Sequence, residues 1–229
     1  MKPFLITEHC SRLVANYPEA TLLLAIARVM SREERECFVR LWIAEGIPYA
    51  FRNAPMLYES VRGWLAKLIG ISPKVVTIVG SARIGYSLSP HPKYGYPFGF
   101  NSDLDFAMVS EHVFTDLSCT FHRWKEDVEE GRVHPRHEKE RKYWQDNLSR
   151  LPCNLARGFV DPHKIPSWHR YPIAMKIANV MWRLSKKLAA TPSAPEVKTI
   201  SIRVYRDWDA FLAQMGLNFW WMLKSFNSN

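Results

Sequence analysis

The sequence predicts an α+β protein in which a small β-sheet is flanked by helices, with extra helices at both ends of the chain. Three short runs are rich in β-branched and apolar residues, as strands are: Val75–Val79, Leu104–Val109 and Lys198–Tyr205. Between and around these runs, apolar residues recur at helical spacing. With 229 residues, of which 47% are hydrophobic, the chain can bury a substantial core.

The order of these elements divides the chain into three parts. We expect a helical N-terminal segment over residues 1–70, packed on a core over residues 71–206. The core carries a basic helical insertion at residues 132–187, and a C-terminal helix follows over residues 207–229. Because no flexible linker separates these parts, we expect one compact domain.

Capping residues, glycines and prolines set the limits of the predicted helices. Ser31 and Glu34 have the spacing of a capping box. The helix from Met56 to Ile69 stops at Gly70. Another helix follows the second strand, and its carboxylates are interpreted as a solvated face: Asp116, Glu126, Asp127, Glu129 and Glu130.

The last two helices are predicted from Pro172 and from a position near Asp207. The final helix ends in a tryptophan-rich stretch that includes Trp220 and Trp221. Such a stretch is interpreted as core or as an oligomer contact.

The stretch from Val75 to Ser110 carries the clearest chemistry. Alternation on its second strand puts Leu104 on the core face and both Asp103 and Asp105 on the other. Two neighbouring carboxylates repel each other unless a cation lies between them. The pattern favours Mg²⁺ or Mn²⁺, because these ions prefer oxygen ligands and bind carboxylates together with substrate phosphates. The alternative is a pair of ordinary strands with solvated aspartates.

The first strand of this stretch ends in Gly80-Ser81, where a glycine turn and a hydroxyl suit a phosphate. At these residues the chain resembles the DNA polymerase β-like nucleotidyltransferase superfamily, whose signature is a strand-end Gly-Ser followed by Asp-x-Asp on the next strand. The strings Gly80-Ser81-Ala82-Arg83-Ile84-Gly85 and Ser102-Asp103-Leu104-Asp105 are most similar to the minimal nucleotidyltransferases. Many of these belong to bacterial toxin–antitoxin and phage-defence systems.

The resemblance implies a nucleotidyltransferase fold built on a small mixed sheet. It also implies metal-dependent transfer of a nucleoside monophosphate from an NTP, with ATP the expected substrate, to a hydroxyl. Asp103, Asp105 and Ser81 are the expected catalytic residues, and the two aspartates are the expected metal ligands. The residues expected to bind the nucleotide are Gly80, Ser81, Arg83, Lys93 and Ser102.

The loop between the two motifs is longer than the minimal members have and is rich in aromatic residues and proline. Its aromatic side chains can stack on a base, with Lys93 near the phosphates. Equally, they can pack on the domain. The residues in question are Tyr86, Pro90, Pro92, Lys93, Tyr94, Tyr96, Pro97 and Phe100.

Active members of the resembled superfamily place a third carboxylate on a strand beside the aspartate pair. In this chain the polar face of the third strand offers Arg203 instead. Asp161 has the best setting for a third metal ligand, because a short apolar run leads into it, although it is also a typical turn residue before Pro162. Spacing does not choose between Asp161 and the remaining candidates, which are Glu196, Asp207 and Asp209.

The net charge of +9 is concentrated in one segment. Arg132 to Lys187 holds thirteen Lys and Arg against four Asp and Glu, whereas the rest of the chain is nearly neutral. Aromatic residues are interleaved with these cations, a combination typical of RNA binding. A basic helix that is merely soluble is the alternative.

The four cysteines are widely separated and include no Cys-x-x-Cys pair, which suggests neither a zinc site nor a disulfide framework. No apolar run is long enough for a membrane span, and the N-terminus lacks a signal-peptide pattern. We therefore expect a cytoplasmic protein that has no membrane partner.

Two functions follow from these observations. The first is a metal-dependent nucleotidyltransferase whose acceptor is an RNA end, a protein or another nucleotide, in a bacterial defence or toxin–antitoxin system. The alternative is a catalytically degenerate protein of this fold that acts as an antitoxin, sensor or RNA-binding subunit. Either function is compatible with a partner protein or with a homo-oligomer.

Overall fold

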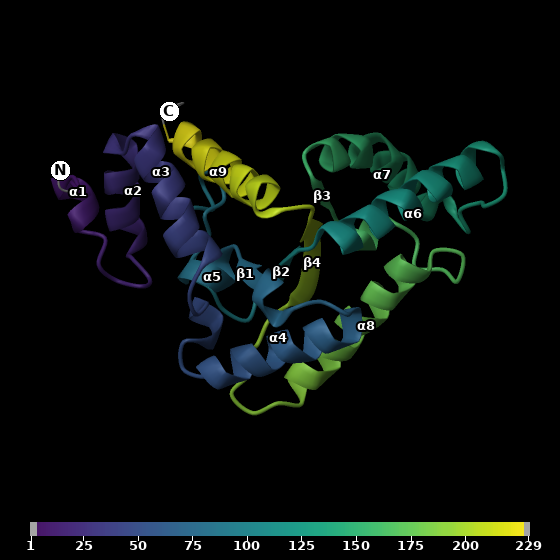
Figure 1. Cartoon of the computed structure of the whole chain (residues 1–229), viewed down its shortest axis with the longest axis horizontal. Coiled ribbons are helices and arrows are strands. Elements are labelled where there is room, and N and C mark those ends of the chain that lie inside the picture. Colours follow the sequence, from purple (N-terminus) through teal and green to yellow (C-terminus); the bar gives the residue numbers. More distant parts are fainter. Residues whose placement is uncertain (1–3, 227–229) are drawn as a thin grey trace.

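The computed structural model describes residues 4–226, which form a four-stranded mixed sheet covered by helices on both faces (Figure 1). The spatial order of the strands is β1-β2-β4-β3. The central pair, β2 and β4, is parallel, and each edge strand runs antiparallel to its neighbour. The strands are β1 (Val76–Val79), β2 (Asp103–Val109), β3 (Phe159–Val160) and β4 (Thr199–Tyr205). The predicted α+β class with a small mixed sheet is confirmed.

Helices make up most of the remaining chain. The α-helices are α1 (Glu8–Ser11), α2 (Ala20–Val29), α3 (Arg32–Phe38), α4 (Pro55–Ile69), α5 (Ser81–Ile84), α6 (Glu111–Glu129), α7 (Glu138–Ala156), α8 (Pro172–Ala189) and α9 (Trp208–Ser225). A π-helical segment (Val39–Ala44) continues α3, and single 3₁₀ turns occupy Tyr49–Phe51, Pro73–Val75 and Pro162–Lys164. None of the described helices is both long and apolar enough to cross a lipid bilayer.

Each face of the sheet packs against its own group of helices, because side chains alternate along the strands. On one face Leu104, Phe106 and Met108 of β2 contact residues of α4, α6 and α8. On the other face Ala107 and Val109 join residues of α2, α3 and α9. Figure 1 shows this arrangement, with α3 and α9 on one side of the sheet and α4 and α8 on the other. The second group covers β2 only from Ala107 onward, so the first residues of the strand stay accessible on that face.

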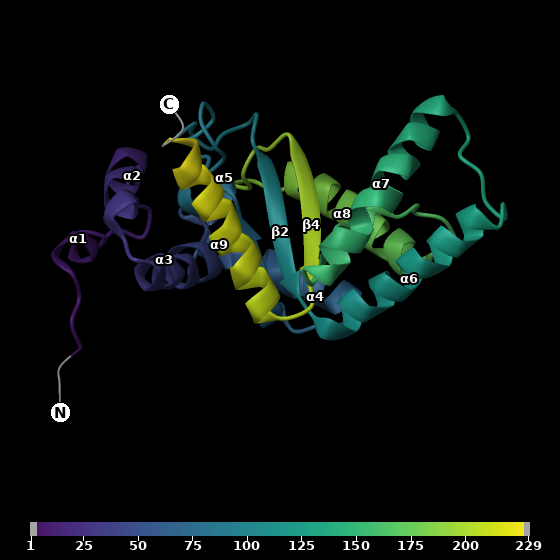
Figure 2. The same ribbon diagram turned by 90° about the horizontal axis from the view of Figure 1, so that it is seen from above.

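The segment expected as a basic insertion also builds the sheet and the core. It contains β3, which pairs with the end of β4, and α8, whose Ile177, Val180 and Leu184 are buried against the sheet. Its other α-helix, α7, lies with α6 at the end of the molecule opposite α1 and α2 (Figure 2). The segment is therefore part of the fold rather than an appendage to it.

Several local predictions are confirmed. Ser31 and Glu34 form both hydrogen bonds of the capping box at the start of α3. Gly70 ends α4 in the left-handed conformation, with φ +93°. By contrast, the interpretation of Asp127 as a solvated residue is wrong, because this side chain is only 1% exposed. Arg132, Arg170 and the Tyr171 hydroxyl all contact its carboxylate, and the cations offset the cost of burying it.

Candidate active site

The turn after β1 depends on the glycine at position 80. Gly80 has φ +70° and ψ −151°, a backbone conformation that residues with a side chain rarely adopt. A Cβ atom at this position would lie 3.6 Å from Oδ2 of Asp105. That distance is an ordinary contact, so the positive φ rather than lack of space requires glycine here, and Ser81 follows as the first residue of α5.

The two aspartates lie at the start of β2, the strand between β1 and β4. In the sheet register Asp103 is opposite Thr199, and Asp105 lies between Val79 of β1 and Ser201 of β4. Thr199 Oγ1 donates to Asp103 Oδ1 at 2.6 Å, and Ser201 Oγ donates to Asp105 Oδ1 at 2.6 Å. Neutral hydroxyls thus hold both carboxylates in place without neutralising their charge.

These two motifs line a single pocket of about 430 Å³. Four of the residues predicted from the sequence meet there: Gly80, Ser81, Asp103 and Asp105. Two other cavities of the described chain are larger, about 560 and 580 Å³, but neither contains a pair of adjacent carboxylates. We therefore place the candidate active site in the smaller pocket.

Helix α9 supplies two further residues to this pocket, Asn218 and Trp221, which the sequence analysis did not identify. Residues three apart on a helix lie on the same face, so both point to the same side. The Trp221 side chain is 48% exposed, which leaves its ring accessible to a ligand. The core interpretation of the tryptophan-rich end does not describe Trp221, because this residue is exposed beside an open pocket, whereas the oligomer contact stays a prediction.

A hydrogen-bond chain fixes the orientation of Asn218. The Arg157 guanidinium, which can only donate, contacts Oε1 of Gln214. Gln214 then donates from Nε2 to Oδ1 of Asn218 at 2.8 Å. The amide oxygen of Asn218 is occupied, and its Nδ2 group is left as a donor at the pocket wall.

The loop between the motifs is held by packing on the domain. The Tyr94 hydroxyl donates to the carbonyl of Ala20 at 2.7 Å, and the His91 amide donates to Ser225 Oγ at 3.0 Å. Tyr86 is 8% exposed, and burial raises the pKa of its neighbour Tyr94 to about 12. These two tyrosines belong to the hydrophobic packing, whereas the pocket is lined from this loop by Ser87, Leu88, Ser89 and Pro90.

Three residues predicted to bind the nucleotide lie outside the pocket lining. Arg83 is buried beside Gly46, whose added Cβ would lie 3.2 Å from the guanidinium, and burial lowers the pKa of this group. Ser102 accepts a hydrogen bond from the Gly99 amide and closes a turn. Lys93 is exposed on the far part of the loop.

Asp161 is 3% exposed and forms ion pairs with two cations. Arg203 Nε lies 2.7 Å from Oδ1, and Lys164 Nζ lies 2.9 Å from Oδ2. Burial alone would raise the pKa of Asp161, but the charges and hydrogen bonds of Arg203 and Lys164 together outweigh it and the pKa is lowered. As a third metal ligand, Asp161 would have to leave both ion pairs.

The other candidates for a third ligand also lie outside the pocket lining. Asp207 accepts a hydrogen bond from the Ala210 amide and caps α9, and Asp209 lines a different cavity. Glu196 is exposed before β4. Within the described residues, Asp103 and Asp105 are the carboxylates that line the pocket.

Many cations of the basic segment are engaged in ion pairs. The paired residues are Arg132, Arg141, Lys142, Arg150, Lys164 and Arg170. Glu138, Asp146 and Asp161 are already counted in the charge of the segment, but Asp127 lies outside it and pairs with Arg132 and Arg170, so the local positive charge is lower than the count indicates. RNA binding by this segment stays a prediction.

The chain was compared with protein-family models, with curated proteins and with solved structures, and none of the three comparisons gave a match. What the structure establishes is an α+β protein with an open pocket that holds a carboxylate pair, a glycine-serine turn and an accessible indole ring.

Proposed function

We propose that this protein is a metal-dependent nucleotidyltransferase that moves a nucleoside monophosphate from an NTP to a hydroxyl acceptor. The observation that carries the proposal is the meeting of Gly80 and Ser81 with Asp103 and Asp105 in one pocket. Neither motif is specific alone. Together, at the ends of two neighbouring strands, they would place a phosphate-binding turn next to metal-binding carboxylates, an arrangement that suits nucleotidyl transfer.

The carboxylate pair suits Mg²⁺ or Mn²⁺. Both groups supply oxygen ligands, and no Lys or Arg of the described chain forms an ion pair with either one. Asp103 and Asp105 would hold the ion. When bound, it would neutralise charge on the triphosphate and polarise the reacting phosphorus.

The other residues of the pocket would bind and orient the nucleotide. The backbone at Gly80 is open to a phosphate oxygen, and the Ser81 hydroxyl can donate to it. The Trp221 ring offers a stacking surface for a base, and Asn218 Nδ2 a donor for a ring nitrogen or carbonyl oxygen. Orientation and charge neutralisation would supply most of the rate.

The test is incubation of the purified chain with each radiolabelled NTP and Mg²⁺ or Mn²⁺, with total RNA, total protein or no acceptor. We expect transfer of label, and loss of transfer in Asp103→Asn and Asp105→Asn. Asp146→Asn is the matched control, because it removes an exposed carboxylate on α7. Absence of transfer to every acceptor, with NTP bound, would contradict the proposal.

The stacking role of Trp221 has its own test. Trp221→Ala should weaken NTP binding by about 5- to 100-fold, because base stacking on an aromatic side chain contributes about 1–3 kcal/mol. Trp220→Ala is the control, since this ring is similarly exposed but borders a different cavity. Fluorescence titration of both variants measures the difference. Equal losses would exclude a specific role for Trp221.

One observation favours a second function, a nucleotide-binding protein without transferase activity. Beside Asp105, β4 presents the Ser201 hydroxyl and then Arg203, where the resembled superfamily places a carboxylate. Under this alternative, Mg²⁺ and an NTP stabilise the protein but no label is transferred. A setting in bacterial defence is part of the hypothesis under either function.

A further inference from the structure

The N-terminal helix α1 is held against α3 by polar contacts. No residue of α1 is buried, and the preceding Phe4, Leu5 and Ile6 are largely exposed. A four-residue helix without burial has little intrinsic stability. Its position must therefore be fixed by the groups that connect it to the rest of the protein.

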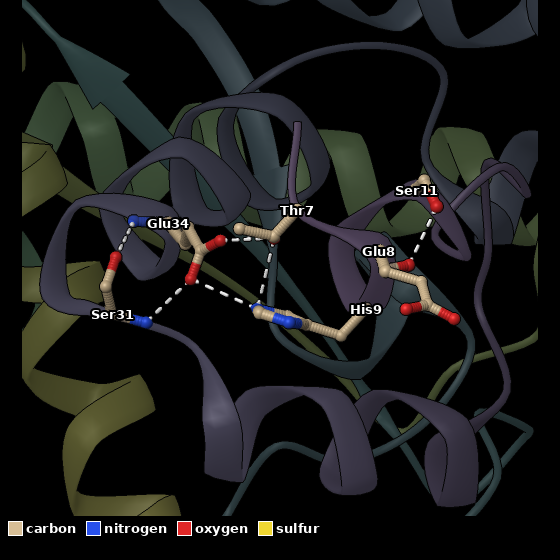
Figure 3. A network of polar contacts seen from close by, with 6 residues as sticks. All are labelled: Thr7, Glu8, His9, Ser11, Ser31 and Glu34. Atoms are coloured by element: carbon tan, nitrogen blue, oxygen red, sulfur yellow. Dashed lines mark hydrogen bonds and ion pairs between the residues drawn. The ribbon is translucent and has the colours of Figure 1, made fainter. Parts of the chain in front are cut away.

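The connecting groups converge on Glu34, as Figure 3 shows. The Thr7 hydroxyl donates to one carboxylate oxygen at 2.5 Å, and His9 Nε2 lies 3.2 Å from the other. The Thr7 hydroxyl and the Ser31 amide stabilise the charged form and lower the pKa of Glu34 to about 2. Glu34 is thus an anion at neutral pH, next to an imidazole.

Cys10 completes a cluster of three potential metal ligands. One ligand atom from each of His9, Cys10 and Glu34 lies within 4.8 Å of the other two. Zinc binds nitrogen and oxygen at about 2.0–2.2 Å and sulfur at about 2.3 Å, so ligand atoms in a tetrahedral site are roughly 3.3–3.7 Å apart. His9 Nε2 lies 3.2 Å from Glu34 Oε2, just below this range, and Cys10 Sγ lies within 4.8 Å of a ligand atom of each.

A second cysteine, Cys37, lies on α3, where its Sγ accepts a hydrogen bond from Arg40 Nη2 at 3.1 Å. Cys37 follows Glu34 by three residues, which places both on the same face of the helix. Burial is the main cause that raises the pKa of the Cys10 thiol, and the Glu34 carboxylate acts in the same direction. A bound cation would reverse this effect, because a coordinating thiol is deprotonated.

We propose that His9, Cys10 and Glu34, with Cys37 as the fourth ligand, form a structural site for Zn²⁺ that joins α1 to α3. Sulfur and imidazole ligands select zinc-class ions, whereas the oxygen-only pair Asp103 and Asp105 suits Mg²⁺. The two sites therefore take different ions. The zinc proposal does not depend on the proposed enzymatic function.

The test is titration of the full chain, without an added histidine tag, with Co²⁺ under a phosphine reductant. We expect one equivalent to give the thiolate-to-cobalt charge-transfer band and the intense visible bands of a tetrahedral ion, and Zn²⁺ to abolish both. Mg²⁺ in excess should change neither. Failure to develop these bands would overturn the proposal.

Variants assign the ligands. Cys10→Ser and His9→Ala should weaken Co²⁺ binding by about 100-fold or more, since even indirect partners of a metal ligand contribute about 10- to 100-fold. Glu34→Gln is the most selective change, because glutamine preserves a capping box but is a poor zinc ligand. Unchanged binding in Cys10→Ser or Glu34→Gln would overturn the site.

Two cysteine variants separate the fourth ligand from non-specific thiol binding. Cys37→Ser should remove part of the charge-transfer intensity and weaken binding, and an unchanged spectrum would exclude Cys37 from the site. Cys153→Ser is the matched control, because Cys153 is likewise an exposed cysteine on a helix but lies on α7. A loss of the spectrum in this control as well would overturn the proposal.

Discussion

Two kinds of aspartate occur on or beside this sheet, and they differ in what surrounds them. Asp127 and Asp161 are almost fully buried, and each is paired with two basic side chains. Asp103 and Asp105 lie in an open pocket and accept hydrogen bonds from neutral hydroxyls. The protein neutralises the first two itself, whereas the charge of the second pair is left for a ligand. Stability should depend on the first pair and ligand binding on the second.

The largest expected effect on stability comes from Asp161→Asn. The change leaves the Arg203 guanidinium and the Lys164 ammonium without their common counter-charge, and breaking a buried pair in this way costs about 3–5 kcal/mol. Because the Arg203 side chain remains 35% exposed, we expect the lower end, about 3 kcal/mol. Urea denaturation measures the difference. A loss below about 1 kcal/mol would show that the ion pairs of Asp161 do not stabilise the fold.

Acid should act on the same two carboxylates. Both have a folded-state pKa below the ordinary value of 3.8: hydrogen bonds from Arg170 lower that of Asp127, and Arg203 and Lys164 together outweigh burial at Asp161. A lowered folded pKa contributes stability that is present above the unfolded pKa and is lost as the pH falls through the folded pKa. The free energy of unfolding should therefore decrease below about pH 4. Asp161→Asn should show a smaller decrease, and an identical acid profile in the two proteins would contradict this account.

A smaller effect is expected for Tyr171→Phe. This side chain is fully buried, and its hydroxyl donates to Asp127 Oδ2 at 2.9 Å. The substitution removes one hydrogen bond to a charged group, while Arg132 and Arg170 remain, so we expect a loss of about 1.5 kcal/mol. Tyr143→Phe is a control, because this exposed hydroxyl donates to the carbonyl of His163. Equal losses in the two variants would show that burial of the Tyr171 hydroxyl beside Asp127 does not increase the contribution of its hydrogen bond to stability.

The smallest change in stability is expected where the functional change is greatest. In the double variant Asp103→Asn with Asp105→Asn, the amide oxygens can still accept from Thr199 and Ser201. The free energy of unfolding without ligand should stay within about 0.5 kcal/mol of the parent. The rise in melting temperature with Mg²⁺ and an NTP should disappear, because it reflects ligand binding to the folded state. A double variant that unfolds would show that Asp103 and Asp105 are needed for stability, as Asp127 and Asp161 are.

The sequence predicted those parts of the candidate site that depend on local order. Gly80, Ser81, Asp103 and Asp105 stand at the ends of two apolar strands, and strand alternation alone puts both carboxylates on one face. Arg83 was expected to bind the nucleotide as part of the string from Gly80 to Gly85 that carries the resemblance. A helix turns by about 200° over two residues, and the guanidinium consequently lies beside Gly46.

Residues whose role depends on distant partners were not predicted. Asp127 resembles its acidic neighbours on α6, and two of the three partners that explain its burial, Arg170 and Tyr171, follow it by more than 40 positions. Asn218 and Trp221 belong to a helix that reaches the pocket only in the folded protein. The orientation of Asn218 further requires Arg157 and Gln214, and no spacing in the sequence indicates that chain.

The pairing of β2 with β4 also constrains when the candidate site can form during folding. Each hydroxyl that orients an aspartate lies 96 residues from it in the chain. Contacts between such distant residues form late, because closing a long loop costs entropy before the contact contributes. On the ribosome, β2 has no neighbour on that side until β4 has been synthesised. The carboxylate pair can therefore acquire this geometry only after Thr199 and Ser201 have been synthesised.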